Sequence, residues 1–445
     1  MHPLIVRRLL LPLHERLIGR DTWSRLASWE ESQWWPQERL AELQIEKLRL
    51  LLSHAATRVP YYRAVIQSSG VNPSTATPGD LSRLPTLDKS AIAANLDQMT
   101  DRATPGGLIP YTTGGSTGQP LSFFIDRPRQ AADQAARARS RRWFGIEPGD
   151  REVLLWGSPI EATTQDRVKS LRDRLTNQRL LSAFDMTPRT MAAYVREIER
   201  FNPAHLFGYP SSLARLARFC HDSGTRLHVP TLRAVFTTGE VLDPAERATL
   251  EEWLGVPVAD GYGAREAGFI AHQCPQGTYH VTMESVIVEL LDDHGATVSP
   301  GERGEITVTH LDAFAMPFIR YRTGDYARLD ERPCPCGRGL IGLRDLDGRR
   351  TDQLRTTAGG HAHALAAIYA VRSCPDIAEF RIVQRASLDL DVDLIERRPL
   401  SPATVDRIRN ELTARIGPVT VRINRVARIA PSASGKHRCV ISEVL

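Results

Sequence analysis

The sequence predicts an α/β fold with a large N-terminal domain, residues 1–347, and a small C-terminal domain, residues 348–445. Between residues 153 and 259, short apolar runs alternate with helical patterns, as in a parallel sheet flanked by helices. From about residue 279 to 330 the pattern changes to successive alternating strands. A charged, turn-rich break at 344–352 precedes a last region with its own helices and strands, which places the domain boundary at about residue 347.

The first elements are expected to be helical. Residues 1–65 form a helical segment with a broad leucine face, and Pro60-Tyr61-Tyr62-Arg63 is expected to end it. Residues 66–105 alternate short helices with Pro/Gly breaks. The run Leu121–Ile125 predicts a strand, and Ala131–Arg142 predicts a helix that ends near Gly145.

The parallel sheet follows. Its expected strands are 153–157, 205–209, 234–240 and 256–259, and its expected helices are 191–201, 211–223 and 245–253. Ligands of such sheets bind at the carboxyl ends of the strands, where Thr238-Gly239-Glu240 and Asp260-Gly261-Tyr262-Gly263 are expected to lie. Later strands are expected at 286–291, 304–310 and 317–321. In the small domain, the expected helices are 363–372 and 404–416 and the expected strands are 380–384, 388–394 and 419–423.

A glycine-rich stretch from Tyr111 to Pro120 is the most distinctive local feature. It carries three glycines and four Ser/Thr hydroxyls. Glycines let backbone N–H groups turn toward an anion, and hydroxyls add further donors, so the stretch is suited to phosphate. It is not a Walker loop, because no Gly-Lys-Ser/Thr triplet is present. A polar hairpin turn is the alternative interpretation.

The charge composition argues against nucleic acid as a partner. The net charge is +5 and the pI is about 9.0, but no Lys/Arg block is interleaved with aromatic residues. The positive excess is better suited to a small polyanion such as ATP or coenzyme A. Among 57 basic residues only four are lysines, Lys47, Lys89, Lys169 and Lys436. Arginine cannot always replace a compact ammonium, so each lysine could matter; we treat the first three as chance survivors.

Cysteine usage and the N-terminus predict a cytoplasmic protein. Six cysteines in 445 residues do not make a disulfide scaffold. The N-terminal run has no small-residue cleavage site, and no apolar run reaches the ~18 residues of a membrane helix. The leucines near Arg7 and Arg8 could nevertheless touch a membrane surface or a partner. Cys220, Cys374, Cys439 and His205 are interpreted as ordinary core residues.

A second constellation joins Cys274 and His280 with the Cys334-Pro335-Cys336 pair. Three thiols and one imidazole would make a tetrahedral Cys3His zinc site if the two segments met in space. Free reduced cysteines and a disulfide are the alternatives, and the sequence leaves all three open.

Five motifs occur in order: TTGGSTGQP at 112–120, TGE at 238–240, GYGAREAG at 261–268, YRTGD at 321–325 and PSASGK at 431–436. Together they resemble the adenylate-forming superfamily of acyl-CoA synthetases over nearly the whole chain. Within it the chain is similar to the phenylacetate–CoA ligase family and its capsule-biosynthesis branch, as Pro60–Arg63, Tyr209-Pro210-Ser211 and Cys334–Arg338 also indicate. The resemblance implies the adenylate-forming ligase fold, with a mobile C-terminal domain that rotates between two half-reactions.

The resemblance also implies the roles of individual residues. Tyr262 would stack on adenine, Asp325 would accept the ribose hydroxyls, and Glu266 would hold Mg²⁺. Catalysis would depend on Lys436, Glu266 and Thr117. The ATP site as a whole would comprise Thr113, Gly114, Gly115, Ser116, Thr117, Gly118, Gly239, Glu240, Asp260, Tyr262, Gly263, Asp325 and Arg349. The loop residues would hold the β- and γ-phosphates, and Lys436 would contact the α-phosphate and the substrate carboxylate.

The implied reaction is ATP- and Mg²⁺-dependent formation of an acyl-adenylate, followed by transfer of the acyl group to coenzyme A. Trp156, Phe207 and Tyr209 could line an acyl pocket for an aryl or bulky apolar acid, although each could equally be core packing. Thr351 at the usual hinge aspartate and Gln119 at a common lysine position leave two alternatives open, an amine acceptor and a non-catalytic nucleotide-binding scaffold. A homodimer is also left open.

Overall fold

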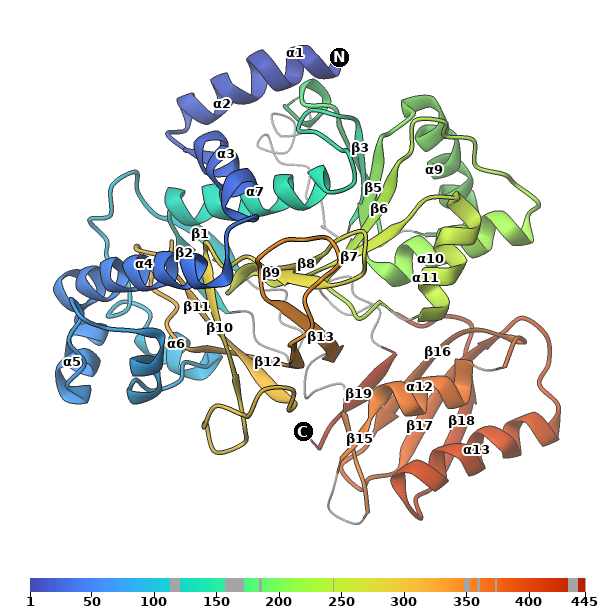
Figure 1. The fold of residues 1–445 in the computed structure, drawn as a ribbon. Coiled ribbons are helices and arrows are strands. Elements are labelled where there is room, and N and C mark those ends of the chain that lie inside the picture. Colours follow the sequence, from blue (N-terminus) through green and yellow to red (C-terminus); the bar gives the residue numbers. More distant parts are fainter. Residues whose placement is uncertain are drawn as a thin grey trace. The chain divides into compact units, whose positions relative to one another are not determined.

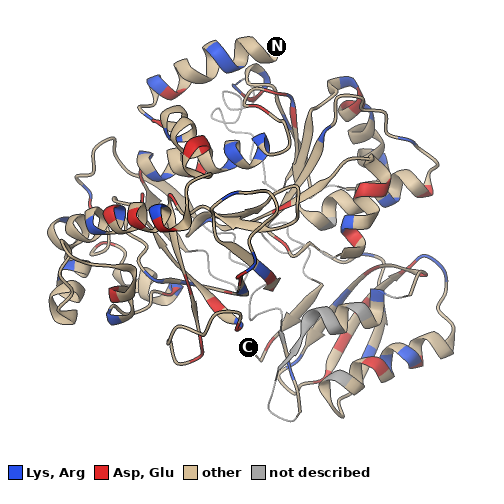
Figure 2. Ribbon diagram, in the orientation of Figure 1, with Lys and Arg blue, Asp and Glu red and all other residues tan. Residues whose placement is uncertain are grey.

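The computed structural model describes residues 1–112, 121–156, 172–183, 186–242, 244–347, 353–357, 361–372, 374–430 and 439–444. The chain divides into two compact units, Met1–Leu346 and Asp347–Leu445. Figure 1 shows the ribbon, and Figure 2 shows that acidic and basic residues are scattered over both units rather than gathered in one basic stripe. None of the described helices is both long enough and apolar enough to span a bilayer.

One long sheet runs through the first unit, and it has a parallel half and an antiparallel half. Among the described residues the strand order is β10-β11-β12-β13-β9-β8-β7-β6-β5-β3-β4. Strands β4, β3, β5, β6 and β7 pair in parallel, and β7–β8, β8–β9, β9–β13, β10–β11 and β11–β12 pair antiparallel. The parallel strands are β3 Glu152–Trp156, β4 Gln178–Ser182, β5 His205–Gly208, β6 Ala234–Thr238 and β7 Val258–Ala264.

Helices cover both faces of the parallel half. The helices α9 Pro188–Phe201, α10 Pro210–Asp222 and α11 Pro244–Leu254 pack against β3, β5, β6 and β7 through Val153, Leu206, Val235 and Val258. Each of these helices begins with proline, whose fixed φ and missing N–H suit the first helical position. On the other face, Arg137 and Arg141 of α7, Arg127–Arg142, pair with Glu152 of β3.

The chain before the sheet is helical, in agreement with the prediction. Its helices are α1 Pro3–Ile5, η1 Val6–Leu10, α2 Leu11–Leu17, α3 Thr22–Ser32, α4 Gln37–Arg58, α5 Pro60–Ser69, η2 Pro78–Arg83 and α6 Lys89–Asn95. The prediction that Pro60–Arg63 ends the helical segment is wrong, because Pro60 starts α5. The leucine face of α4 packs against β10–β12 through Leu40, Leu48 and Leu51, next to Val286 and Ile306.

Two predicted strand positions are also wrong. Asp260–Gly263 lies inside β7 rather than after it, because Gly261 to Ala264 pair with β8. Residues 317–320 precede the strand predicted there; Arg320 has a φ of +54°, and β12 begins at Tyr321.

The antiparallel strands are β8 Gly268–Gln273, β9 Tyr279–Val281, β10 Val286–Leu291, β11 Gly304–His310, β12 Tyr321–Asp330 and β13 Gly342–Asp347. A separate hairpin pairs β1 Ile109–Thr112 with β2 Ser122–Ile125.

The second unit has its own core. Its sheet has the order β18-β17-β16-β19 among the described residues, with α12 Ala364–Arg372 and α13 Pro402–Ile416 packed on it through Val371, Ile408 and Leu412. The strands are β16 Ile377–Gln384, β17 Leu390–Glu396, β18 Val421–Arg425 and β19 Val440–Ser442, and β14 Gln353–Arg355 pairs with β15 His361–His363. The second unit is therefore an α+β unit, as predicted.

Candidate active site

The carboxyl ends of the parallel strands bring several predicted site residues to one edge of the sheet. Trp156 ends β3, Tyr209 follows β5, and Glu240 lies two residues after β6. Gly239 between them has a φ of +83°, and a Cβ at this position would lie 3.2 Å from Cε1 of Tyr209. Only glycine combines this backbone conformation with such a close approach to the ring.

The three predicted acyl-pocket aromatics form a continuous stack. The ring centroid of Trp156 lies 4.2 Å from that of Tyr209 and 5.4 Å from that of Phe207, with interplanar angles of 19° and 22°. Burial, and then the nearby carboxylate of Glu240, raise the pKa of Tyr209 to about 12, so its hydroxyl stays protonated. The three rings thus form one stack beside the last residues of β3 and β5, in which Tyr209 is only 3% exposed.

The turn between β7 and β8 carries two arginine contacts that hold the start of the glycine-rich stretch. Nη1 of Arg265 donates to the carbonyl oxygen of Thr112 at 2.6 Å, where β1 ends. The carbonyl of Arg265 in turn accepts from Nη2 of Arg129 at 2.7 Å, and Arg129 is only 1% exposed. The point at which the chain enters the glycine-rich stretch is thus fixed to the β7–β8 turn. Thr113, Gly114, Gly115, Ser116, Thr117 and Gly118 lie outside the described residues.

Glu266, the predicted magnesium ligand, is buried and lies beside a lysine. Its Oε1 is 3.0 Å from Nζ of Lys89, and the glutamate is 2% exposed. Lys89 is the first residue of α6, which Asp88 caps by accepting from the N–H of Ala91. The preceding Leu87 exchanges backbone hydrogen bonds with the neighbours of Tyr321, at 2.8 and 2.9 Å. These contacts fix Lys89 next to Glu266, a pairing that the sequence analysis did not anticipate.

Tyr262 and Asp325, the predicted adenine and ribose contacts, touch each other. The hydroxyl of Tyr262 lies 2.9 Å from Oδ2 of Asp325 and 3.1 Å from Oγ1 of Thr323. The two residues come from β7 and β12, so the long sheet joins the GYG and YRTGD motifs into one site. Gly263 permits the tight β7–β8 turn, because a Cβ there would lie 2.6 Å from the carbonyl oxygen of Gly268.

Asp260 lies beneath this site, with both carboxylate oxygens bonded inside the protein. Oδ1 accepts from the hydroxyl of Thr237 at 2.6 Å, and Oδ2 accepts from the hydroxyl of Tyr279 at 2.7 Å. Burial raises the pKa of Asp260 to about 6, although both hydroxyl donors favour the ionised form. The sequence analysis placed Asp260 among the nucleotide contacts. In the structure, its carboxylate links β7 to β6 and β9 through these two hydrogen bonds.

This raised pKa predicts a specific pH dependence of stability. Native Asp260 keeps its proton up to a pH of about 6, whereas an unfolded aspartate loses it near 3.8. The native state therefore binds more protons between these values, and the stability that this proton provides is lost as the pH rises from about 4 through about 6. The loss amounts to about 3 kcal/mol. Urea unfolding of wild type and Asp260→Asn across this range should show a flatter dependence in the variant; equal slopes would contradict the assignment.

The four predicted zinc ligands come together at the end of β8, the start of β9 and the loop before β13. The ligand atoms of Cys274, His280, Cys334 and Cys336 all lie within 4.8 Å of one another. Sγ of Cys274 and Sγ of Cys334 are 3.7 Å apart, and Nε2 of His280 is 3.2 Å from Sγ of Cys336. Zn–S bonds of ~2.3 Å in a tetrahedron place two sulfurs about 3.8 Å apart, whereas a disulfide needs about 2.05 Å.

The surroundings of the four ligands also fit a metal. Both cysteine segments form a Cys-Pro-x-Gly turn, in which the N–H of Gly277 donates to Cys274 O at 2.8 Å and that of Gly337 to Cys334 O at 3.0 Å. Nδ1 of His280 lies 3.1 Å from the carbonyl oxygen of Leu340. This carbonyl holds the ring proton on Nδ1, so the lone pair of Nε2 faces the sulfurs, as in a metal-ligating histidine.

The cysteines and the histidine that were predicted to be core residues are buried or half-buried. Cys220 and Cys374 are buried, Cys439 is half-buried, and His205 is buried with Nε2 3.0 Å from Oε1 of Glu152. Arg349, Thr351 and Lys436 lie outside the described residues. Sequence reasoning missed the roles of Lys89, Arg129 and Arg265. The scarcity of lysine was a usable signal for the first, whereas 51 other arginines hid the two arginines.

The chain is similar in sequence and in fold to known adenylate-forming enzymes. The family model described as AMP-binding enzyme matches residues 108–314. Protein CapK of Staphylococcus aureus is 22% identical over 99% of this chain and 98% of its own length, and a phenylacetate-coenzyme A ligase of Thermus thermophilus is 26% identical over 80% of each. The fold matches a crystal structure of 2-hydroxyisobutyryl-CoA ligase with a TM-score of 0.74, at 21% identity over 93% of this chain and 92% of that one. The amide bond synthetase McbA of Marinactinospora thermotolerans matches with a TM-score of 0.52, at 20% identity over 90% and 92%.

The fold and the matched segment define an AMP-binding enzyme. The segment includes the glycine-rich stretch, the aromatic stack, Glu266 and the zinc-type Cys274 and His280. The chain is thus similar, over nearly its whole length, to members of the adenylate-forming superfamily.

Proposed function

We propose that the protein activates a carboxylic acid with ATP and Mg²⁺ to an acyl-adenylate and then transfers the acyl group to coenzyme A. The observation that carries this proposal is the contact between Tyr262 and Asp325, which lie 63 residues apart in the sequence. It joins two motifs of the superfamily across β7 and β12, and Glu266 lies in the turn that follows β7, so adenosine and phosphate contacts could be combined there.

In the first step, a carboxylate oxygen of the substrate attacks the α-phosphorus of ATP and pyrophosphate leaves. Two anions must approach each other, so the protein acts mainly by positioning them and neutralising charge. Glu266 is suited to hold Mg²⁺, because a hard cation prefers carboxylate oxygens; bound there, Mg²⁺ would offset phosphate charge. Tyr262 and Asp325 would orient the adenosine. The resemblance assigns the β- and γ-phosphates to residues 113–118 and further nucleotide contacts to Arg349 and Lys436, all of which lie outside the described residues.

The substrate is proposed to be an aryl or bulky apolar acid. The stack of Trp156, Tyr209 and Phe207 supports this proposal, because a flat aromatic wall favours a flat or apolar ligand over a short polar one. The name of the Thermus relative, a phenylacetate-coenzyme A ligase, points to the same class of acid.

An amine is the second candidate acceptor. Thr351 replaces the hinge aspartate that the resemblance leads one to expect, and one structural neighbour is an amide bond synthetase. With coenzyme A, the thiol would attack the acyl carbonyl and AMP would leave, whereas an amine would attack the same carbon to give an amide.

The deciding experiment measures pyrophosphate release from ATP and Mg²⁺ across aryl, fatty and amino acids, with and without coenzyme A. Release that depends on one acid and a thioester that forms only with coenzyme A would establish the ligase. An acyl-adenylate that coenzyme A leaves intact and an amine consumes would establish amide synthesis. ATP binding without pyrophosphate release under any condition would overturn both.

We also propose that Cys274, His280, Cys334 and Cys336 hold one structural zinc ion. Four protein ligands leave no open position for a substrate, so the ion would cross-link β8, β9 and the loop before β13 rather than take part in the reaction. Tyr279 lies next to His280 and bonds Asp260, so this cross-link would also support the strands under the active site.

Removal of zinc is expected to destabilise the protein. At a free zinc concentration a thousand times Kd, the bound ion contributes about 4 kcal/mol to folding. Purified wild type should contain one zinc per chain by mass spectrometry, and Cys336→Ser should lack it and melt at a lower temperature. Cys220→Ser is the matched control, since it replaces a buried thiol in a different core cluster and should keep the metal. A wild-type protein refolded with zinc that retains none would contradict the proposal.

We place the reaction in the cytoplasm, because a thiol cluster of this kind persists in a reducing compartment. None of the six cysteines, all of which are described, forms a disulfide in the structure.

A further inference from the structure

The first helical segment, α1, η1 and α2, exposes an apolar ridge to solvent. The ridge consists of Met1, Leu4, Ile5, Leu9, Leu13 and Leu17, which are 46–77% exposed. In the described part of the chain these six account for most of the large apolar side chains that are strongly exposed; the others are Trp34, Leu50, Leu175 and Val241. Ile5, Leu9, Leu13 and Leu17 recur every four residues, so they follow one side of the helix. Scattered exposed leucines are normal, but a continuous row on one helix indicates a contact surface.

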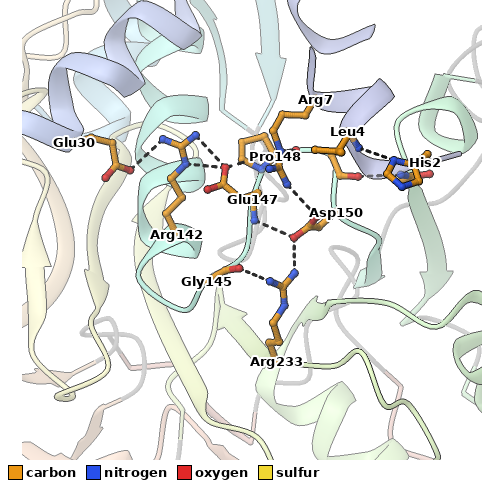
Figure 3. Close-up of polar contacts among 12 residues, drawn as sticks. His2, Leu4, Arg7, Glu30, Arg142, Gly145, Glu147, Pro148, Asp150 and Arg233 are labelled. Atoms are coloured by element: carbon orange, nitrogen blue, oxygen red, sulfur yellow. Dashed lines mark hydrogen bonds and ion pairs between the residues drawn. The ribbon is translucent and has the colours of Figure 1, made fainter. Parts of the chain in front are cut away.

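The ridge is held outward because the opposite side of the segment is attached to the protein body. Val6 is fully buried, and its side chain lies against Gly149. Nε of Arg7 donates to Pro148 O at 3.1 Å and its Nη2 donates to Asp150 at 3.2 Å, as Figure 3 shows. The amino group of Met1 donates to Oδ1 of Asn177 at 3.0 Å.

The contacts of Arg7 with Asp150 and Glu147 belong to a wider ion-pair network. Asp150 also binds Arg233, and Glu147 lies 3.0 Å from Arg142, which in turn reaches Glu30 at 3.5 Å (Figure 3). This network connects the helical segment with α3, α7 and the loop before β6. The side of the segment that carries Val6, Arg7 and Glu15 therefore faces the protein. The row of Ile5, Leu9, Leu13 and Leu17 faces solvent, whereas an ordinary surface helix turns its apolar stripe inward.

The charges beside the ridge are all positive. Arg8 and Arg16 are exposed, and Arg7 and Arg20 are engaged with Asp150 and Glu15. Glu15 is the single carboxylate among residues 1–17, all of which are described, and it is buried against Arg20. The exposed side thus combines leucine, isoleucine and arginine without any acid.

We propose that this ridge docks the enzyme on an anionic lipid surface, with the helical segment lying in the plane of the headgroups. Leucines and isoleucine would enter the boundary between headgroups and acyl chains, and Arg8 and Arg16 would contact lipid phosphates, as in interfacial amphipathic helices. The segment is too short to span a bilayer, which takes ~20 apolar residues. The proposal is independent of the reaction that the active site performs.

A second copy of the chain fits the ridge less well than lipid. Antiparallel pairing of two such helices would bring Arg8 of one copy toward Arg16 of the other, with no exposed acid to offset the repulsion. A single helix also buries less than the ~800 Å² per partner of a stable interface.

The test is co-sedimentation of the full-length protein with vesicles of phosphatidylcholine, alone or with about 30% phosphatidylglycerol. Wild type should bind the anionic vesicles more tightly, and rising salt should weaken that binding. The double variant R8Q/R16Q should lose about thirtyfold in affinity for the anionic vesicles. The triple variant L9Q/L13Q/L17Q should lose binding to both kinds of vesicle.

L50Q is the matched control, because Leu50 is 64% exposed on α4, away from the ridge. It should bind vesicles like wild type, and all variants should keep the wild-type melting temperature and pyrophosphate release. Wild type that binds neither vesicle, or a triple variant that binds like wild type, would overturn the proposal. A dimer in light scattering that L9Q/L13Q/L17Q dissociates, without vesicle binding, would instead assign the ridge to a second copy.

Discussion

Replacement of Glu266 by glutamine is expected to reduce pyrophosphate release by about 10²–10³-fold at saturating ATP. Glutamine keeps the volume and one carbonyl oxygen but removes the negative charge that a hard cation prefers. Because Lys89 is about one-third exposed, its ammonium can turn to water once the carboxylate is gone, so the fold should survive. The measurement is the rate of pyrophosphate release against Mg²⁺ concentration, with the melting temperature as a check of folding.

The chain offers a matched control for this variant. Asp312 is a buried carboxylate 2.8 Å from Lys47, so this pair repeats the carboxylate–lysine arrangement of Glu266 and Lys89. Asp312 lies in the loop after β11 and is not one of the proposed site residues. Asp312→Asn should lower the melting temperature, because Lys47 and Arg25 both pair with this carboxylate, but it should leave turnover largely intact. If Glu266→Gln kept wild-type turnover, the assignment of Glu266 to the metal would be wrong.

Replacement of Lys436 by alanine is expected to abolish measurable acyl-adenylate formation, a loss of about 10³-fold, while ATP still binds. The proposed role is to neutralise charge between the substrate carboxylate and the α-phosphate as they approach, which matters most in the transition state. The maximal rate should therefore fall much more than the affinity for ATP, which calorimetry would measure.

Lys47→Ala is the control for this second prediction. It removes one of the three other lysines of a lysine-poor chain, and its partner Asp312 lies outside the proposed site. It should destabilise the first unit and leave adenylation in place. If Lys436→Ala released pyrophosphate at the wild-type rate, this lysine would have no role in the mechanism. The proposal that the second unit takes part in adenylation would then lose its main support.

The local pattern of the sequence predicted most elements of the fold correctly. The alternation from residue 153 onward predicted β3, β5, β6 and their helices, because apolar periods of two and 3.6 residues directly reflect which side chains face a core. The errors fell where pairing partners decide the outcome. Nothing local to Gly261-Tyr262-Gly263 indicates a strand, since glycine disfavours strands; pairing with β8, and with β6 at Gly261, extends β7 through them.

For Cys274, His280, Cys334 and Cys336, too, the sequence showed the residue types but not their arrangement in space. The sequence offered three thiols and one imidazole as a zinc site, with free cysteines and a disulfide as alternatives, but only the pairing of β9 with β13 brings His280 near Cys336. The distance of 3.7 Å between Sγ of Cys274 and Sγ of Cys334 then argued against a disulfide between them, which no spacing along the chain could do.

The order of five motifs by itself indicated the resemblance to the adenylate-forming superfamily, which the similar proteins support. Only the tertiary structure determined that Lys89 neutralises Glu266, that Tyr262 bonds Asp325, and that Asp260 is bonded inside the protein rather than exposed at the site. The same holds for the outward ridge of the first helices. The physical reason is that burial and charge pairing depend on distances in space between distant segments, whereas a sequence records only neighbours along the chain.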